Sequence, residues 1–298
     1  MDLRHLRCFV AVAEELHFGR AAERVHMDPS PLSRVIKELE EDLGVLLFAR
    51  TTRSTRLTCA GRALREHVPR VFAAFEQARD AAKAAANGYP RQLRIALSDG
   101  IAPSRLPALL AQCRQEEPEL GFRLFEVPLS QQIKGLHDDL YDVGFAQSDE
   151  VGDGLLADPA WCDPLVVAVP AEHPLATRKS IPLDEVLFYP LVVCDPQVCE
   201  GQSRQIARLL RAEDREPLVV EQVATVDLMK ALVAAGFALG LTGASQLAGS
   251  REHGIVACPL GGESLVLTTY LLRVDASPSE TLARFIELVS GLEPQDDG

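Results

Sequence analysis

Residues 21–57 read AAERVHMDPSPLSRVIKELEEDLGVLLFARTTRSTRL, and this stretch decides the fold of the first part of the chain. It predicts a short alanine-rich helix over about 19–25, a tight link at His26 and Met27, and a second helix up to Leu43. We expect Asp28 to cap the second helix, Pro29 to fill its first position and Gly44 to end it. Its apolar residues recur on one face, which we expect to be buried: Leu32, Val35, Ile36, Leu39 and Leu43. Two short helices joined by a tight turn make a helix-turn-helix.

The outward face of that second helix is polar and basic. Hydroxyl and cationic side chains on such a helix suit the major groove of DNA, where they reach phosphates and base edges. The predicted DNA contacts of the helix are Ser30, Pro31, Ser33, Arg34 and Lys37. A plain helical bundle with a solvated charged face would give the same spacing, and the segment that follows argues against it.

Residues 45–57 have apolar, β-compatible ends and a short basic middle, which predicts a hairpin, or wing. Clustered arginines contact phosphate or enter a minor groove, so we expect the wing to bind DNA as well. Its predicted contacts are Arg50, Thr51, Arg53 and Arg56.

A long helix is predicted over 59–86, with Thr58 as its cap. Its apolar residues step by four and three, as in a coiled-coil seam. The helix either packs on its own subunit or pairs with a second copy, and the scarcity of core partners nearby favours a dimer. The predicted dimerisation residues are Leu64, Val68, Val71 and Phe75. Residues 87–90, Asn-Gly-Tyr-Pro, end the helix and form a linker.

From residue 91 onward the pattern changes to alternating strands and helices. This predicts an α/β region with mainly parallel sheets, large enough for two lobes. Ligands in such folds bind at the carboxyl ends of strands, near helix N-termini. The expected strands are 93–97, 122–127, 143–146, 165–169, 191–193, 218–223, 238–241, 255–259 and 265–272, and the expected helices are 103–117, 131–140, 201–211, 225–235 and 279–292.

The charge of the chain is divided unevenly, which indicates two parts with different partners. The chain of 298 residues has a net charge of −13, divided into +2 over residues 1–90 and −15 over residues 91–298. The seven cysteines are odd in number and form no CxxC, and no HExxH occurs, so we expect no disulfide framework, no metal and no cofactor. Charged residues interrupt the first fifteen positions and no apolar run could span a membrane, which predicts a cytoplasmic protein.

The residues quoted above closely resemble the winged helix-turn-helix of the LysR-type bacterial transcriptional regulators. The resemblance runs through 1–14, 21–26, 31–51 and 57–61, and continues more loosely through 173–176 and 233–241. It implies a winged helix-turn-helix (1–58), a linker and dimerisation helix with a hinge (59–90), and a periplasmic-binding-protein-like α/β effector domain (91–298). Lobe one of that domain would be about 91–165 and 266–298, and lobe two about 166–265.

The resemblance also implies partners. LysR-type regulators bind double-stranded promoter DNA as homodimers that commonly pair into homotetramers. An effector, expected here to be a small organic metabolite, binds between the lobes and alters the contact with DNA and with RNA polymerase. One departure stands at Asp28-Pro29-Ser30-Pro31, because relatives usually have Gln before the proline and that Gln can reach a base. Specificity must therefore depend more on Ser33, Arg34 and the wing.

The effector cleft is assigned by analogy with the family. Its residues would be Ser98, Asp99, Gly100, Ser130, Gln147, Cys199, Gln202 and Thr225. A hydroxyl and free N–H groups at helix starts would suit an oxyanion, although Ser98 and Thr225 could equally be helix caps. Relatives that sense aromatic acids often carry a basic residue where Gln147 stands. Its absence, with Asp99 nearby, argues against a strongly anionic effector.

Two alternatives remain open. Peroxide-sensing members of the family carry a reactive thiol near the position of Cys194 and Cys199, which would make this chain a redox sensor, although neither Lys nor His is adjacent in sequence to stabilise a thiolate. An enzyme or a transport-binding protein could use the same two-lobed fold, but an enzyme would leave residues 1–88 without a role. The sequence therefore predicts a ligand-responsive DNA-binding regulator and no enzyme.

Overall fold

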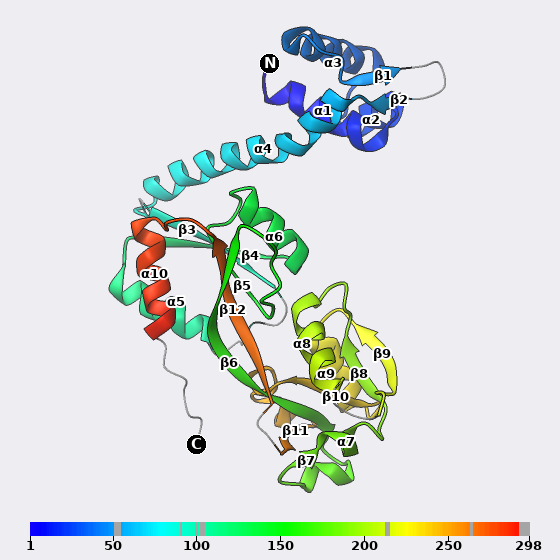
Figure 1. Cartoon of the computed structure of the whole chain (residues 1–298), viewed down its shortest axis with the longest axis vertical. Helices are drawn as coiled ribbons and strands as arrows, with labels where there is room; N and C mark the ends of the chain where they lie inside the picture. Colours follow the sequence, from blue (N-terminus) through cyan, green and yellow to red (C-terminus); the bar gives the residue numbers. More distant parts are fainter. Residues whose placement is uncertain are drawn as a thin grey trace. The chain divides into compact units, whose positions relative to one another are not determined.

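The structure is a computed structural model that describes residues 1–50, 55–89, 91–98, 101, 105–211, 215–262 and 265–291, without the side chains of Arg50, Arg251 and Glu252. Two compact units, residues 1–80 and 81–298, divide the chain (Figure 1). The first unit contains α1 (Leu3–Glu15), α2 (Phe18–Arg24), α3 (Pro29–Leu43), β1 (Phe48–Arg50), β2 (Thr55–Leu57) and most of α4 (Cys59–Ala86).

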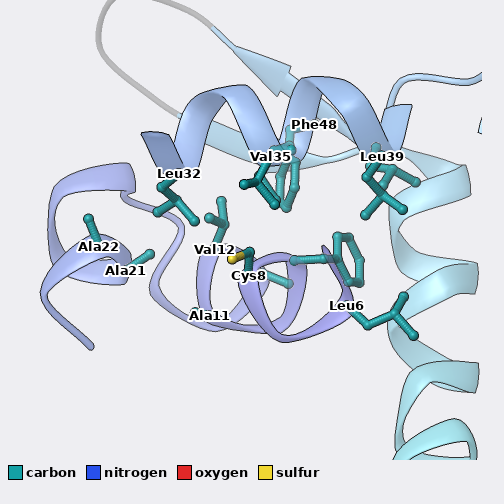
Figure 2. Packing of buried hydrophobic residues seen from close by; sticks show 14 of the residues in the cluster. Leu6, Cys8, Ala11, Val12, Ala21, Ala22, Leu32, Val35, Leu39 and Phe48 are labelled. Atoms are coloured by element: carbon teal, nitrogen blue, oxygen red, sulfur yellow. The ribbon is translucent and has the colours of Figure 1, made fainter. Parts of the chain in front are cut away.

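The core of the first unit lies between its helices. Figure 2 shows Leu32, Val35 and Leu39 of α3 pointing toward the apolar face of α1. Phe9 and Ile36 are also fully buried there, so burial of the periodic apolar faces stabilises the unit. The predicted helix-turn-helix is confirmed as α2, a link through His26 and Met27, and α3.

The ends of α3 are partly as predicted. Pro29 is its first residue, and Gly44 ends it with a left-handed backbone (φ +69°) that glycine adopts without strain. Asp28 occupies the N-cap position, but its side chain makes no capping hydrogen bond. Leu43 is 37% exposed rather than buried, because it lies in the last turn of α3, past the helices that cover Leu39.

A buried carboxylate connects α3 to the wing. Glu40 is 7% exposed, and its Oε1 accepts hydrogen bonds from the backbone N–H groups of Leu47 (2.8 Å) and Phe48 (3.1 Å). The wing itself is the predicted hairpin, with Phe48 opposite Leu57 and Ala49 opposite Arg56. These bonds fix the first wing strand relative to the end of α3.

The long helix α4 has the predicted bounds, Cys59–Ala86. Thr58 caps it as predicted, because its Oγ1 accepts from the N–H of Gly61 at 3.0 Å and donates to the carbonyl oxygen of Leu46 at 2.7 Å. At Gly61 a Cβ would overlap the carbonyl oxygen of Leu47, so only glycine allows this close approach of helix and wing.

The second unit begins with the end of α4 and then alternates strands and helices. Its strands are β3 (Arg91–Leu97), β4 (Leu120–Glu126), β5 (Val143–Ala146), β6 (Leu155–Pro170), β7 (Ile181–Pro182), β8 (Leu191–Cys194), β9 (Val219–Val223), β10 (Leu239–Gly243), β11 (Ile255–Gly261) and β12 (Val266–Val274). Its α-helices are α5 (Arg105–Glu116), α6 (Leu129–His137), α7 (Leu183–Val186), α8 (Glu200–Leu210), α9 (Val226–Ala234) and α10 (Glu280–Gly291), and short 3₁₀ turns are η1 (Pro174–Thr177), η2 (Ala244–Leu247) and η3 (Ser250–His253).

The strands join in the order β4-β3-β5-β12-β6-β10-β8-β9, and β11 pairs with β6 and β7. The sheet is mixed rather than mainly parallel, because β6 runs antiparallel to β10, β11 and β12, and β12 runs antiparallel to β5. The first half of β6, Leu155–Pro164, was not predicted as a strand. Pro159 and Pro164 lack N–H groups, and a bulge opposite Thr269 and Tyr270 accommodates the first of them.

Two separate sets of apolar clusters define two lobes in this unit. Lobe one is built on β3, β4, β5, α5, α6 and α10, and its core contains Phe145, Trp161 and Phe285. Lobe two is built on β8 to β11, α8 and α9, and its core contains Val167, Leu191 and Met229. Strands β6 and β12 lie side by side and connect the lobes (Figure 1).

Candidate DNA-binding face and effector cleft

The outward face of α3 is exposed as its pattern predicted. Ser30, Pro31, Arg34 and Lys37 are exposed, and Ser33 is half-buried. Lys37 forms an ion pair with Glu41 one turn later, at 3.4 Å, while both side chains remain in solvent. In an exposed pair of this kind the lysine remains available to a phosphate, since the pair contributes little stability.

Of the predicted wing residues, the structure describes the side chain of Arg56, which is exposed on β2. The side chain of Arg50 and the whole of Thr51 and Arg53 lie outside the described residues. Arg62, at the start of α4, donates to the carbonyl oxygen of Leu57 at 3.1 Å and so supports the base of the wing.

The predicted dimer seam on α4 divides into two pairs of residues. Val68 is fully buried in the core of the first unit, and Leu64 packs against that core. This corrects the prediction for Val68, because the first turns of α4 cover the core of their own chain. Val71 and Phe75, one and two turns further on, are each 44% exposed. Leu64 is half-buried, and a dimer contact through Leu64, Val71 and Phe75 remains a prediction.

A cavity of about 330 Å³ opens between the two lobes. Lobe one contributes Ser98 after β3 and residues 126–128 after β4, and lobe two contributes residues 198–199, 224–227 and Gln246. A larger hollow of about 580 Å³ lies beside α9 and η3, but its lining comes from lobe two alone. The smaller cavity is the better candidate for a site that senses the position of one lobe relative to the other.

The cavity includes three of the predicted effector residues: Ser98, Cys199 and Thr225. The hydroxyl of Ser98 donates to Oε1 of Gln132 at 3.1 Å. Thr225 does cap α9, since its Oγ1 accepts from the N–H of Leu228 at 3.2 Å, and it lines the cavity as well.

The other predicted effector residues lie elsewhere or cannot be placed. Ser130 is in the first turn of α6, and its N–H already donates to Oε1 of Glu200 at 3.1 Å. Gln147 and Gln202 are buried and outside the cavity lining. Asp99 and Gly100 lie outside the described residues. The prediction missed Glu126 and Asp227, two carboxylates at the cavity.

Helix α8 holds the lobes together through side chains that the sequence did not single out. The amide of Gln205 donates to the carbonyl oxygens of Gln147 (2.9 Å) and Thr268 (2.6 Å) and accepts from the N–H of Thr268 at 2.9 Å. One turn later, Arg208 forms ion pairs with Asp149 and Glu150 of lobe one. A ligand that moves α8 would therefore change the contact between the lobes.

The two thiols considered for redox sensing are buried in the core of lobe two. Cys194 ends β8 and Cys199 precedes α8, and neither forms a disulfide. Both pack in an apolar cluster with residues such as Val192 and Met229.

The described parts of the chain contain neither a metal-binding cluster nor a membrane-spanning helix. Within those parts, no three His, Cys, Asp or Glu side chains gather as a metal would require. Among the helices so described, none is both long and apolar enough to cross a membrane.

Comparison with known proteins identifies both units. The profile of the bacterial regulatory helix-turn-helix protein, lysR family, matches residues 3–62, and the profile of the LysR substrate binding domain matches residues 86–292. The chain belongs to the LysR family of bacterial transcriptional regulators.

Individual members of the LysR family resemble this regulator over most of its length. It is 32% identical over 246 residues to the HTH-type transcriptional regulator YnfL of Escherichia coli (strain K12), covering 82% of this chain and 83% of that protein. It is 31% identical over 242 residues to AlsR of Bacillus subtilis (strain 168), covering 81% and 80%. A crystal structure of full-length CbnR, complexed with its target DNA, aligns with a TM-score of 0.75 at 27% identity, covering 97% of this chain and 99% of that one.

These matches decide between a regulator and an enzyme or transport-binding protein on the same fold. The chain is a LysR-type DNA-binding transcriptional regulator with an effector-binding domain. Its relatives are regulators and belong to a family of non-enzymes, so the reading as an enzyme or transport protein on the same fold is set aside.

Proposed function

We propose that this LysR-family regulator binds promoter DNA as a dimer, and that a small organic molecule bound between its lobes changes transcription. The dimers would pair into tetramers and contact RNA polymerase in the cytoplasm. The observation that carries the proposal is a cavity of about 330 Å³ whose lining comes from both lobes, in a chain with an exposed basic reading helix.

The DNA contacts proposed are those of α3 and the wing. They are Ser30, Pro31, Ser33, Arg34, Lys37, Arg50, Thr51, Arg53 and Arg56. The exposure of Arg34 and Lys37 on α3 supports the helix contacts, and the exposure of Arg56 supports the wing contacts. Arginine binds guanine with two hydrogen bonds, so Arg34 is the proposed base reader.

For self-association, the exposed apolar side chains of Val71 and Phe75 support a dimer contact along α4. A dimer would present two reading helices to half-sites about one or a few turns of DNA apart. We retain the domain limits 1–58, 59–90 and 91–298 as a proposal, supported by the family matches at 3–62 and 86–292.

The effector is proposed to bind at Ser98, Cys199 and Thr225 together with the neighbouring lining residues. Because α8 of lobe two bonds to lobe one near this cavity, a ligand there could favour one arrangement of the lobes over another. Only a difference in affinity between the two arrangements can drive such a change.

The test uses a transcriptional reporter under the DNA upstream of the regulator's own gene. Ala224→Phe should fill the cavity and abolish the response of the reporter to growth conditions, while operator affinity in a gel shift stays within a few-fold. Ala276→Phe places the same ring on an exposed loop and should leave the response unchanged. A full response in Ala224→Phe would place the effector elsewhere.

A second variant in the same reporter distinguishes a redox sensor that acts through Cys194 and Cys199 from a ligand sensor. Replacement of Cys194 and Cys199 by serine should leave a ligand-driven response largely intact. A response lost in this double variant and retained in Ala224→Phe would instead support a redox sensor.

A further inference from the structure

The charged side chains in the described lining of the cleft between the lobes are all acidic. The charged residues of that described lining are Glu126 and Asp227, with no Lys, Arg or His among them. Asp227 is paired with Lys230 at 3.3 Å, whereas Glu126 forms no ion pair within the described residues. Of the other described lining residues, Ser98, Cys199, Thr225 and Gln246 are polar or carry a thiol, and five are apolar: Val127, Pro128, Val198, Ala224 and Val226.

The helix N-terminus on the lobe-one side of the cleft, that of α6, already binds a carboxylate of the chain. Helix N-termini attract anions because their N–H groups lack partners and the helix dipole is positive there. At the start of α6 the N–H of Ser130 donates to Glu200, whose side chain is only 15% exposed. A carboxylate ligand would have to displace Glu200 or lie beside it, and like charges repel.

We propose that the effector cleft takes a small organic cation, a protonated amine on an apolar body, and discriminates against carboxylates. The inference rests on the proposed function for the assignment of the cleft to an effector. The amine would pair with Glu126, and the apolar body would lie on Val127, Pro128 and Val198. A cavity of about 330 Å³ restricts the ligand to a small molecule.

The charge preference of the cleft can be measured with thiol reagents of opposite charge. Val198 is 39% exposed at the cavity, so Val198→Cys provides an accessible thiol there. Cys59, Cys162 and Cys199 are replaced by serine in the full-length chain to remove the exposed thiols and the neighbouring one. The thiol is modified with cationic trimethylammonium-ethyl or anionic sulfonato-ethyl methanethiosulfonate, and mass spectrometry follows the rate of modification. Each rate is then divided by the rate at which the same reagent reacts with free 2-mercaptoethanol.

We expect the normalised rate with the cation to exceed that with the anion by roughly 3- to 10-fold, because a cleft of one charge sign concentrates the opposite ion. Glu126→Gln should bring the ratio toward unity. Glu119→Gln, at the opposite end of β4, removes the same charge away from the cavity and should leave the ratio unchanged.

The measurement involves neither DNA nor transcription, so it can fail independently of the proposed function. A ratio at or below unity, or one that Glu126→Gln does not alter, would overturn the cation assignment even if Ala224→Phe abolishes the reporter response. A rate ratio well above unity that Glu126→Gln reduces would support the cation assignment. If the reporter with Ala224→Phe still responded fully in that case, only the effector role of the cleft would be contradicted, and its preference for cations would stand.

Discussion

The side chain of Glu200 in lobe two accepts a hydrogen bond at 3.1 Å from the backbone N–H of Ser130 in lobe one. This contact joins the start of α8 to the start of α6. It also places an internal carboxylate at the N-terminus of α6, where helix N–H groups attract anions. Together with the bonds of Gln205, it makes α8 an element through which lobe two contacts lobe one.

Replacement of Gln205 tests the role of α8. Gln205→Ala leaves the N–H and carbonyl of Thr268 without the amide that bonds both, so the free energy of unfolding should fall by about 1–3 kcal/mol. Gln112→Ala on α5 removes an amide that bonds only the exposed Glu116, and should cost less than about 0.5 kcal/mol. Urea denaturation measures both, and equal effects would contradict a structural role for Gln205.

The wing is tested through the salt dependence of DNA binding. Arg56→Ala should weaken binding evenly across sequences and reduce the slope of log affinity against log salt by about 0.9 if one phosphate contact is lost. Arg178→Ala, an exposed arginine of lobe two paired with Glu185, serves as the control. Anisotropy titrations at several salt concentrations check this, and an unchanged slope for Arg56→Ala would remove Arg56 from the interface.

Assembly is tested at α4. Phe75→Asp would place a charge in the proposed dimer contact and should yield monomers in sedimentation velocity, without unfolding the single chain because Phe75 is 44% exposed. Val68→Ala should instead lower the free energy of unfolding by about 2 kcal/mol, since Val68 is fully buried. A dimeric Phe75→Asp, or a wild type that is monomeric at micromolar concentration, would disprove the contact.

The acid stability of lobe one should depend on Glu117. Hydrogen bonds from Arg284 and Arg91 hold the pKa of this carboxyl below its ordinary value of 4.5. Because the pKa is lowered in the folded state, the stabilisation is present above about pH 4.5 and is lost as the pH falls through the folded pKa.

Glu117→Gln removes this dependence, and its neighbour Glu116→Gln is the matched control. The difference in melting temperature between wild type and Glu117→Gln should be constant above pH 5.5 and shrink below about 4.5. A difference that stays constant into acid would show that the ion pairs of Glu117 do not stabilise the fold.

The reading helix and α4 could be predicted because their signals are local. Pro29 and Gly44 mark the ends of α3, and the apolar spacing marks its buried face. The first half of β6 could not be predicted, because Pro159 and Pro164 interrupt a strand that only its pairing with β12 stabilises.

The effector site was predicted less completely than the DNA-reading helix α3. Ser98, Cys199 and Thr225 do line a common cavity, but Glu126 was missed because a single exposed acid at a strand end has no distinctive pattern. The bond between Ser130 and Glu200 joins residues 70 positions apart, and no local spacing indicates it. Burial of Gln147 and Gln202 likewise follows from the docking of two lobes rather than from either segment alone.

Selection from a pool of random double-stranded DNA tests the central claim most directly, because it needs no known operator. The full-length wild type should enrich a motif of two half-sites about 10 base pairs, or a small multiple of this, apart. Arg34→Ala should relax the preference at one position of each half-site, with a loss of about 1–3 kcal/mol on the wild-type motif. An enriched motif identical in wild type and Arg34→Ala would contradict base reading by Arg34, and the absence of any enriched motif would contradict sequence-specific binding by this chain.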